Sequence, residues 1–113
     1  MPLLKIMTNV QVDASVEVLA EATQVVASML AKPTSYVQIV LQDAQSMAFA
    51  GTTEPCAYLE LHSLGLPEAQ TESMSQTLCG FVTANLRIAA NRTYIQFCAP
   101  DRHLWGWDAK TFA

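Results

Sequence analysis

Charged residues are scarce in this sequence of 113 residues: they make up 14% of the chain, and its net charge is −4. Only six residues are basic, and they are scattered without forming a run: Lys5, Lys32, Arg87, Arg92, Arg102 and Lys110. Proteins that bind nucleic acids or anionic membranes concentrate Lys and Arg in one run or on one face. The charge pattern therefore predicts that neither nucleic acid nor a membrane is a partner.

Long apolar runs are also missing. No segment approaches the ~20 apolar residues that a membrane-spanning helix needs. The amino terminus lacks a basic region followed by a long apolar one, which a secretory signal peptide would have. We therefore expect a cytoplasmic protein, and secretion by a route without a signal peptide stays open.

Cysteine is limited to three widely spaced residues, Cys56, Cys79 and Cys98. They form no Cys-x-x-Cys pair, and no His cluster lies near them to complete a zinc-binding pattern. An odd number of dispersed cysteines favours reduced, partly buried thiols in a reducing compartment. We predict no metal and no cofactor.

Apolar residues, in contrast, make up 51% of the chain. The length fits one domain over residues 1–113, which can bury roughly two-thirds of its unfolded surface. With so few charges, such a domain has more apolar surface than its own core can hide. We therefore expect a single domain that assembles into an oligomer.

The first half of the sequence predicts a strand, a helix and a second strand. Residues 2–8 alternate around Lys5, as a strand does. Residues 14–30 repeat apolar side chains at intervals of three and four, which indicates an amphipathic helix. Glu17 and Glu21 lie near its amino terminus, the positive end of the helix dipole. Lys32-Pro33 ends this helix, and β-branched residues over 36–41 predict the second strand.

The same order recurs in the second half, with a strand at 57–64, a helix opened by Pro67 and a strand at 93–98. The apolar stripe of that helix comprises Met74, Leu78, Phe81, Val82 and Leu86. Tyr36-Val37-Gln38-Ile39 is also similar to Tyr94-Ile95-Gln96-Phe97. Two βαβ units with right-handed crossovers predict an α+β fold: a four-stranded sheet with both helices on one face.

This arrangement leaves the other sheet face bare. We expect that face to contain Leu, Ile, Tyr and Phe, and to be covered by other subunits because no third helix remains. The tail over 100–113 is too aromatic for a solvated end, with Leu104, Trp105, Trp107 and Phe112. Gly106-Trp107 is either a short added strand or an arm packed on a neighbour, and its aromatic side chains can anchor an interface, line a pocket or do both.

Pro2 directly follows the initiator Met1, which is normally removed before a small residue. Removal would leave a free secondary amine that is held rigidly by the proline ring. A free α-amine titrates near pH ~8, so a modest decrease in its pKa would make it a proton acceptor at neutral pH. Pro2 is therefore a candidate catalytic base, on the condition that Met1 is lost.

Residues 47–57, Met-Ala-Phe-Ala-Gly-Thr-Thr-Glu-Pro-Cys-Ala, resemble the macrophage migration inhibitory factor family of the tautomerase superfamily. Further similarities extend almost from end to end, and they include Met1-Pro2, Lys32-Pro33, His62-Ser63-Leu64-Gly65, Leu86-Arg87-Ile88, Gly106-Trp107 and Thr111-Phe112-Ala113. The resemblance implies a homotrimer of βαβ-βαβ subunits with one active site at each subunit boundary. It also implies a keto-enol tautomerase that acts on phenylpyruvate and related arylpyruvates, and in some members on dopachrome derivatives.

The resemblance assigns catalytic roles to Pro2 as the base and to Lys32, which would bind the substrate carboxylate and lower the proline pKa. An apolar wall and a nearby cation both disfavour a protonated amine, so these roles agree with the chemistry. The implied substrate-binding residues are Leu3 beside the base, Lys32, Leu64 in the pocket wall, Tyr94 and Gln96 from the adjacent subunit, and Trp107 and Phe112 at the aromatic rim.

Two positions depart from the family pattern. Gln96 stands where animal members of the family have asparagine, which puts the binding geometry and the substrate preference in doubt. Cys56-Ala57-Tyr58-Leu59 lacks the Cys-x-x-Cys pair of the animal cytokine, so a thiol-disulfide oxidoreductase activity that relies on that pair is disfavoured.

Alternative interpretations remain open from the sequence. Lys32 can be a helix-end lysine that interacts with the helix dipole, and Tyr94 and Trp107 can be interface aromatics alone. A cytokine-like trimer that binds a protein receptor, with incidental catalysis, is the second functional hypothesis. An oligomeric scaffold that binds small molecules without turnover is the third.

Overall fold

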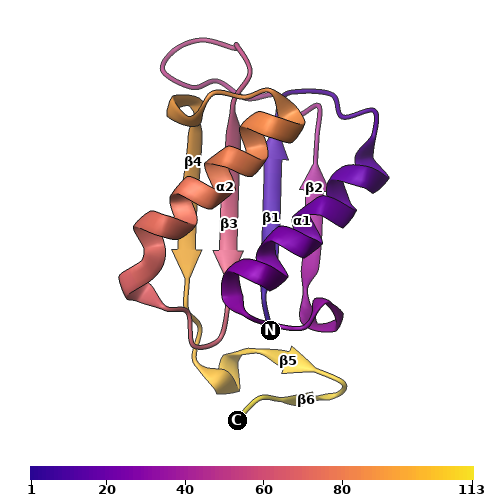
Figure 1. The fold of residues 1–113 in the computed structure, drawn as a ribbon, viewed down its shortest axis with the longest axis vertical. Helices are drawn as coiled ribbons and strands as arrows, with labels where there is room; N and C mark the ends of the chain where they lie inside the picture. The colour runs from indigo at the N-terminus through magenta and orange to yellow at the C-terminus, as the bar shows by residue number, and fades with distance from the viewer.

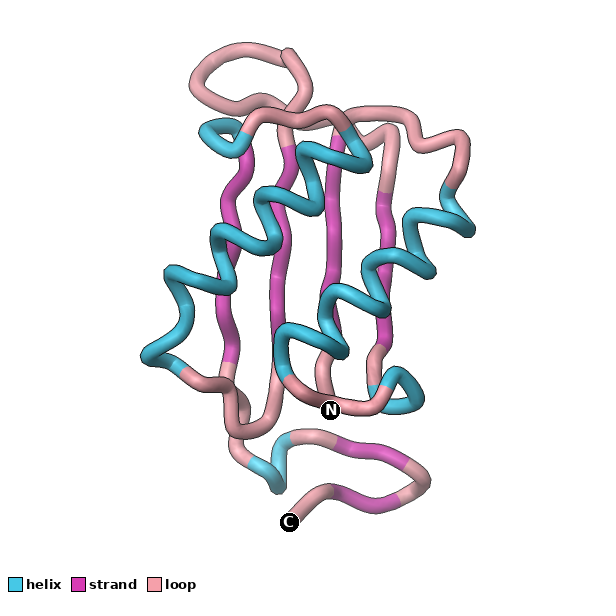
Figure 2. Tube along the Cα trace, in the orientation of Figure 1, coloured by secondary structure: helices cyan, strands magenta, loops and turns pink.

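The computed structural model describes residues 1–113 and has the predicted α+β fold (Figures 1 and 2). The sheet contains four strands in the spatial order β2-β1-β3-β4. Their bounds are Leu3–Thr8 for β1, Gln38–Gln42 for β2, Ala57–His62 for β3 and Thr93–Cys98 for β4. Helix α1 (Ser15–Leu30) joins the parallel pair β1 and β2, and α2 (Thr71–Leu86) joins the parallel pair β3 and β4. The two units meet where β1 and β3 pair antiparallel.

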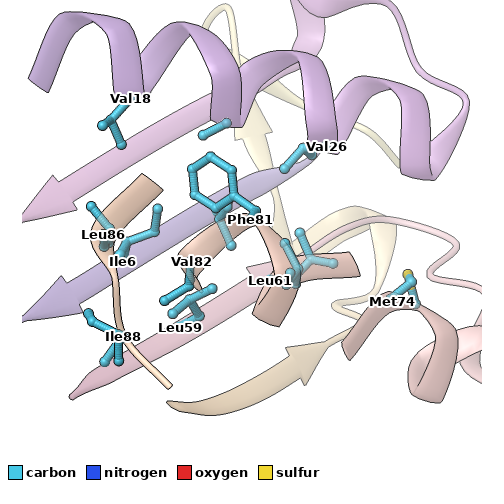
Figure 3. Close-up of a cluster of buried hydrophobic side chains, with 14 of the residues drawn as sticks. Ile6, Val18, Val26, Leu59, Leu61, Met74, Phe81, Val82, Leu86 and Ile88 are labelled. Carbon is cyan, nitrogen blue, oxygen red and sulfur yellow. The ribbon is translucent and has the colours of Figure 1, made fainter. Parts of the chain in front are cut away.

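The core lies between the sheet and the two helices, which cover the same face (Figure 3). Because strand side chains alternate, every second residue of β1 and β3 points to the helices, and Leu4, Ile6, Leu59 and Leu61 are fully buried there. The predicted stripe of α2 is buried in full, and the Phe81 ring points from α2 toward α1 (Figure 3).

Three predicted boundaries were wrong. The strand predicted at 57–64 ends two residues earlier, at His62. The other two boundaries lie next to prolines. The segment 36–41 is not all strand, because Tyr36 belongs to a 3-10 turn, Thr34–Tyr36, and β2 begins at Gln38. Helix α2 does not begin at Pro67, whose backbone is not helical (ψ 86°), and a 3-10 turn at Glu68–Gln70 precedes Thr71. In both places a short turn at a proline competes with the regular element that the pattern favoured.

The second sheet face has no helix over it, as predicted, but it is more polar than predicted. The strand register places on this face Leu3, Lys5, Met7, Gln38, Val40, Gln42, Tyr58, Glu60, His62, Tyr94, Gln96 and Cys98. The isoleucine and phenylalanine side chains of β2 and β4 pack against the core instead, namely Ile39, Ile95 and Phe97. The prediction was wrong in composition because a period of two sends neighbouring residues to opposite faces.

The carboxyl-terminal tail forms a hairpin of its own. Strand β5 (Gly106–Trp107) pairs antiparallel with β6 (Lys110–Thr111), so Gly106-Trp107 is a short strand whose partner lies in the same chain. Asp108 and Ala109 both have positive φ, as a two-residue type I′ hairpin turn requires. The hairpin lies beyond the end of the sheet where the chain begins (Figure 1). None of the helices is long and apolar enough to cross a bilayer.

Candidate functional site

The amino terminus enters the middle of the sheet, and this fixes the position of Pro2. The Gln38 N–H donates to the Pro2 carbonyl oxygen at 3.0 Å, and Leu3 then pairs with Gln38 on one side and His62 on the other. Pro2 is fully buried, whereas Met1 is half-buried. The residue predicted as the base therefore lies in a rigid, largely dry environment at one end of β1.

Lys32 is brought to the same end of the sheet by the way α1 stops. Ala31 adopts a left-handed conformation (φ 52°), and its N–H and that of Lys32 donate to the carbonyls of Ser28 and Ala27 at 3.3 and 2.9 Å. These two bonds form a Schellman motif, here without glycine. The chain then reverses through Pro33 into β2, whose first residue, Gln38, binds Pro2. The Lys32 side chain is exposed.

The electrostatic environment of the amino terminus disfavours a positive charge. Burial, and then the charges of Lys32 and Arg102, lower the pKa of the Met1 amine below its ordinary value of 8.0. Removal of Met1 would move the amine inward by one residue, about 3.8 Å, to the fully buried Pro2. Arg102 belongs to no sequence motif and reaches this place only through the β4–β5 connection, so the sequence did not indicate it.

The carboxyl-terminal hairpin lies against this end of the sheet. The Trp105 and His62 rings are 6.5 Å apart in an edge arrangement, and His62 is the partner of Leu3. The Trp107 and Phe112 rings stack at 6.0 Å with an angle of 11° between their planes. The pocket-wall candidate, Leu64, is buried two residues after the end of β3. One chain thus has all of these at the same end of the sheet: Pro2, Leu3, Lys32, Leu64, Trp107 and Phe112.

Tyr94 lies at the opposite end of the sheet. It pairs with Tyr58, which pairs with Met7, five residues from Pro2 and so about 16 Å away along β1. The Tyr94 side chain is 68% exposed, and its ring lies 4.7 Å from that of Phe49. Within one chain Tyr94 cannot reach Pro2, so a role in that site requires an adjacent subunit, as the resemblance implied.

Gln96 lies on the uncovered face, on the edge strand β4, in a polar network that the sequence did not predict. The Tyr58 hydroxyl is 2.7 Å from Gln96 Oε1 and 3.0 Å from Glu60 Oε2, and its single proton serves one of them at a time. Glu60 Oε1 is 2.9 Å from His62 Nε2. The hydrogen bond from His62, then that from Tyr58, lowers the Glu60 pKa, whereas burial and then Glu60 raise the Tyr58 pKa. A period-two pattern places Tyr58, Glu60 and His62 on one face of the same strand, but only the register of β3 and β4 brings Gln96 opposite Glu60.

The loop over 47–57 is held by two polar side chains. The Arg92 guanidinium donates from Nε to Pro55 O at 2.9 Å, from Nη1 to Phe49 O at 3.1 Å and from Nη2 to Glu54 O at 3.0 Å. The central guanidinium carbon, Arg92 Cζ, lies 5.2 Å from the centre of the Phe49 ring. The Asn9 side chain binds the same loop: its Nδ2 donates to the Glu54 carbonyl oxygen at 3.1 Å, and its Oδ1 accepts from the Cys56 N–H at 3.0 Å. These contacts hold Phe49 against Tyr94.

The cysteines and possible metal ligands add no chemistry to the site. All three cysteines are free, with Cys56 buried and Cys79 and Cys98 half-buried, as predicted. No group of three or more His, Cys, Asp or Glu side chains is arranged to hold a metal ion. What the amino-terminal end offers is a half-buried amine next to the buried Pro2, two cations and an aromatic rim.

Comparison with known proteins identifies relatives over the full length. The family described as macrophage migration inhibitory factor matches residues 1–113. The macrophage migration inhibitory factor of Meriones unguiculatus is 36% identical over 115 residues, covering 100% of both chains, and the homolog of Brugia malayi is 35% identical, covering 99% of both. The crystal structure of the homologue from Prochlorococcus marinus has a TM-score of 0.93 and 38% identity, covering 98% of this chain and 99% of that one. The chain therefore belongs to the macrophage migration inhibitory factor family, whose members have tautomerase and cytokine-like roles.

Proposed function

We propose that this protein is an isomerase that interconverts the keto and enol forms of phenylpyruvate and related arylpyruvates, with Pro2 as the general base after Met1 is lost. Dopachrome derivatives are a second aromatic substrate class for the same site. The observation that carries the proposal is the burial of Pro2 at the place where Lys32 and Arg102 act on the amino terminus. After Met1 is lost, the Pro2 amine would be buried beside these two cations, so it would be neutral at lower pH than an exposed amine. Only a neutral amine accepts a proton.

The proposed reaction balances without an oxidant or reductant. The Pro2 nitrogen takes a proton from C3 of the keto acid, the C–H electron pair forms the C2=C3 double bond, and the carbonyl pair moves onto the C2 oxygen. Solvent then protonates that oxygen to give the enol, and Pro2 returns its proton to solvent. Lys32 binds the carboxylate, while Leu64, Trp107 and Phe112 provide apolar surface for the aryl group.

The proposed enzyme is a homotrimer, since an adjacent subunit must bring Tyr94 and Gln96 to Pro2. A trimer would also cover the sheet face that carries no helix. We expect light scattering at micromolar concentration to give the mass of three chains, and the carboxyl-terminal hairpin to contribute to the assembly. A monomer under these conditions would contradict the shared site.

Lys32→Ala is expected to weaken arylpyruvate binding more than folding. Loss of a charge-assisted contact to the carboxylate should reduce the free energy of substrate binding by about 1.5 to 3 kcal/mol, which is measured as a higher KM. The exposed side chain makes no hydrogen bond within the chain, so the free energy of unfolding should change little. Lys32→Arg is the matched control, because it keeps the charge and should keep most of the binding. Unchanged KM and kcat in Lys32→Ala would leave Lys32 as a helix-end residue.

Receptor binding by a cytokine-like trimer is the second candidate. Apolar side chains remain exposed near the amino-terminal end, with Leu104 at 69% and Trp107 at 54%, and such surface fits a protein partner. Nanomolar binding to a receptor without turnover of phenylpyruvate would favour this role. Turnover that depends on Pro2 would favour the enzyme.

A further inference from the structure

We infer that Arg102 is a second substrate-facing cation of this site: it binds the C2 oxygen as that oxygen becomes an enolate, while Lys32 binds the carboxylate. The inference rests on the proposed function and extends it to a residue outside every motif in the sequence. It predicts that the two cations act at different stages of the same reaction.

Arg102 is held in place at the amino-terminal end by its own backbone and side chain. It begins the 3-10 turn Arg102–Leu104 between β4 and β5, and its Nε donates to the Phe112 carbonyl oxygen at 2.7 Å. The Trp105 N–H donates back to the Arg102 carbonyl at 3.4 Å, and the Trp105 ring contacts His62 beside Leu3. The guanidinium is therefore anchored at one nitrogen, next to the aromatic rim.

The other two guanidinium nitrogens are available. Arg102 makes no hydrogen bond through Nη1 or Nη2, and no carboxylate pairs with it, because the chain's single ion pair joins His62 and Glu60. Lys32 is likewise without an ion-pair partner. Both cations act on the amino terminus, and they do so from separate connections, α1–β2 and β4–β5. Two unpaired cations near the amino terminus, next to the buried Pro2, form a site for an anion.

The charge of the proposed transition state matches this pair. An arylpyruvate enters with one negative charge, on its carboxylate, which one cation satisfies. Proton transfer to Pro2 develops a second negative charge on the neighbouring C2 oxygen. A cation that faces this oxygen stabilises the transition state more than the bound substrate, and so acts on kcat rather than on KM.

The same charge also affects the base. Arg102 and Lys32 are the charged groups that act on the amine, and His62 ends β3 beside Leu3. Removing the Arg102 charge leaves one cation fewer to disfavour the protonated amine, so the Pro2 pKa rises. Since the base works in its neutral form, the acidic limb of the kcat/KM profile then moves to higher pH.

The test compares three variants with the wild type, all freed of Met1 and assayed with phenylpyruvate across pH. Arg102→Gln removes the charge and the bond to Phe112, Arg102→Lys removes the bond alone, and Arg87→Gln removes a charge from an exposed position after α2, far from Pro2. We expect Arg102→Gln to lower kcat about 10- to 100-fold, less than a fully buried oxyanion donor would, and to shift the acidic limb upward. Arg102→Lys should leave the acidic limb of the kcat/KM profile at its wild-type pH and keep most of kcat. Arg87→Gln should match the wild type in both.

Two results would overturn the inference while leaving the proposed function standing. If Arg102→Gln behaves like Arg87→Gln in an active enzyme, Arg102 does not face the substrate. If Arg102→Lys loses as much activity as Arg102→Gln, the residue serves only to anchor the hairpin. If the wild type without Met1 does not turn over phenylpyruvate, the proposed function itself fails.

Discussion

Pro2→Gly, in protein that has lost Met1, is expected to slow phenylpyruvate tautomerisation by about 10²- to 10⁴-fold, the range typical of general acid-base catalysis. Glycine keeps a free amine but loses the secondary nitrogen and the ring that holds it. The Pro2 side chain is buried, yet it lies at the end of β1 rather than among the core residues between sheet and helices. The assembly should therefore persist while kcat falls.

A form that retains Met1 should be impaired to a similar extent. Its Pro2 nitrogen is an amide, which accepts no proton, and Met1 itself is half-buried at the site. Mass spectrometry establishes the amino terminus of each preparation, and light scattering establishes that all preparations form assemblies of the same mass. If the form with Met1 turns over phenylpyruvate as fast as the form without it, Pro2 is not the base.

Phe81→Ala is expected to produce the largest loss of stability among single core changes, about 3 to 5 kcal/mol of unfolding free energy. The ring points from α2 toward α1 and is only 5% exposed, so its removal leaves a cavity between the helices and the sheet (Figure 3). Denaturant unfolding at one fixed protein concentration measures the effect, since assembly contributes to stability.

Val16→Ala is the matched control for Phe81→Ala. Val16 also lies on a helix, α1, but it is 73% exposed and removes little apolar area from water. Its unfolding free energy should stay within about 0.5 kcal/mol of the wild type. A loss below about 1 kcal/mol for Phe81→Ala would mean that the helices close the cavity by moving together.

Local pattern was sufficient for most of the fold. Alternation around Lys5 predicted β1, and the stripe that contains Phe81 predicted α2, because burial of one face imposes a period on the sequence. The repeated order of elements then predicted the topology, since crossovers have one hand. Where a proline began a short turn, at Pro33 and Pro67, the same periodic signal predicted the boundaries wrongly.

The candidate site was only partly accessible from the sequence. The pairing of Met1 with Pro2 indicated a possible amine base without any knowledge of the fold, and the family resemblance supplied Lys32 and the aromatic rim. Their roles stay predictions until they are measured. Arg102 could not be found in this way, because nothing in its neighbouring residues distinguishes it from an exposed surface arginine.

By itself the sequence determined the α+β class, the helical face of the sheet and the proline next to Met1, since each depends on residues close together in the chain. Only the tertiary structure decided the composition of the uncovered face, the Tyr58–Gln96 contact, the distance of Tyr94 from Pro2 and the approach of Arg102 to the amino terminus. These features depend on strand register and on chain reversals between distant segments. A shift of one residue in register would send every side chain of a strand to the opposite face, and periodicity alone carries no record of that choice.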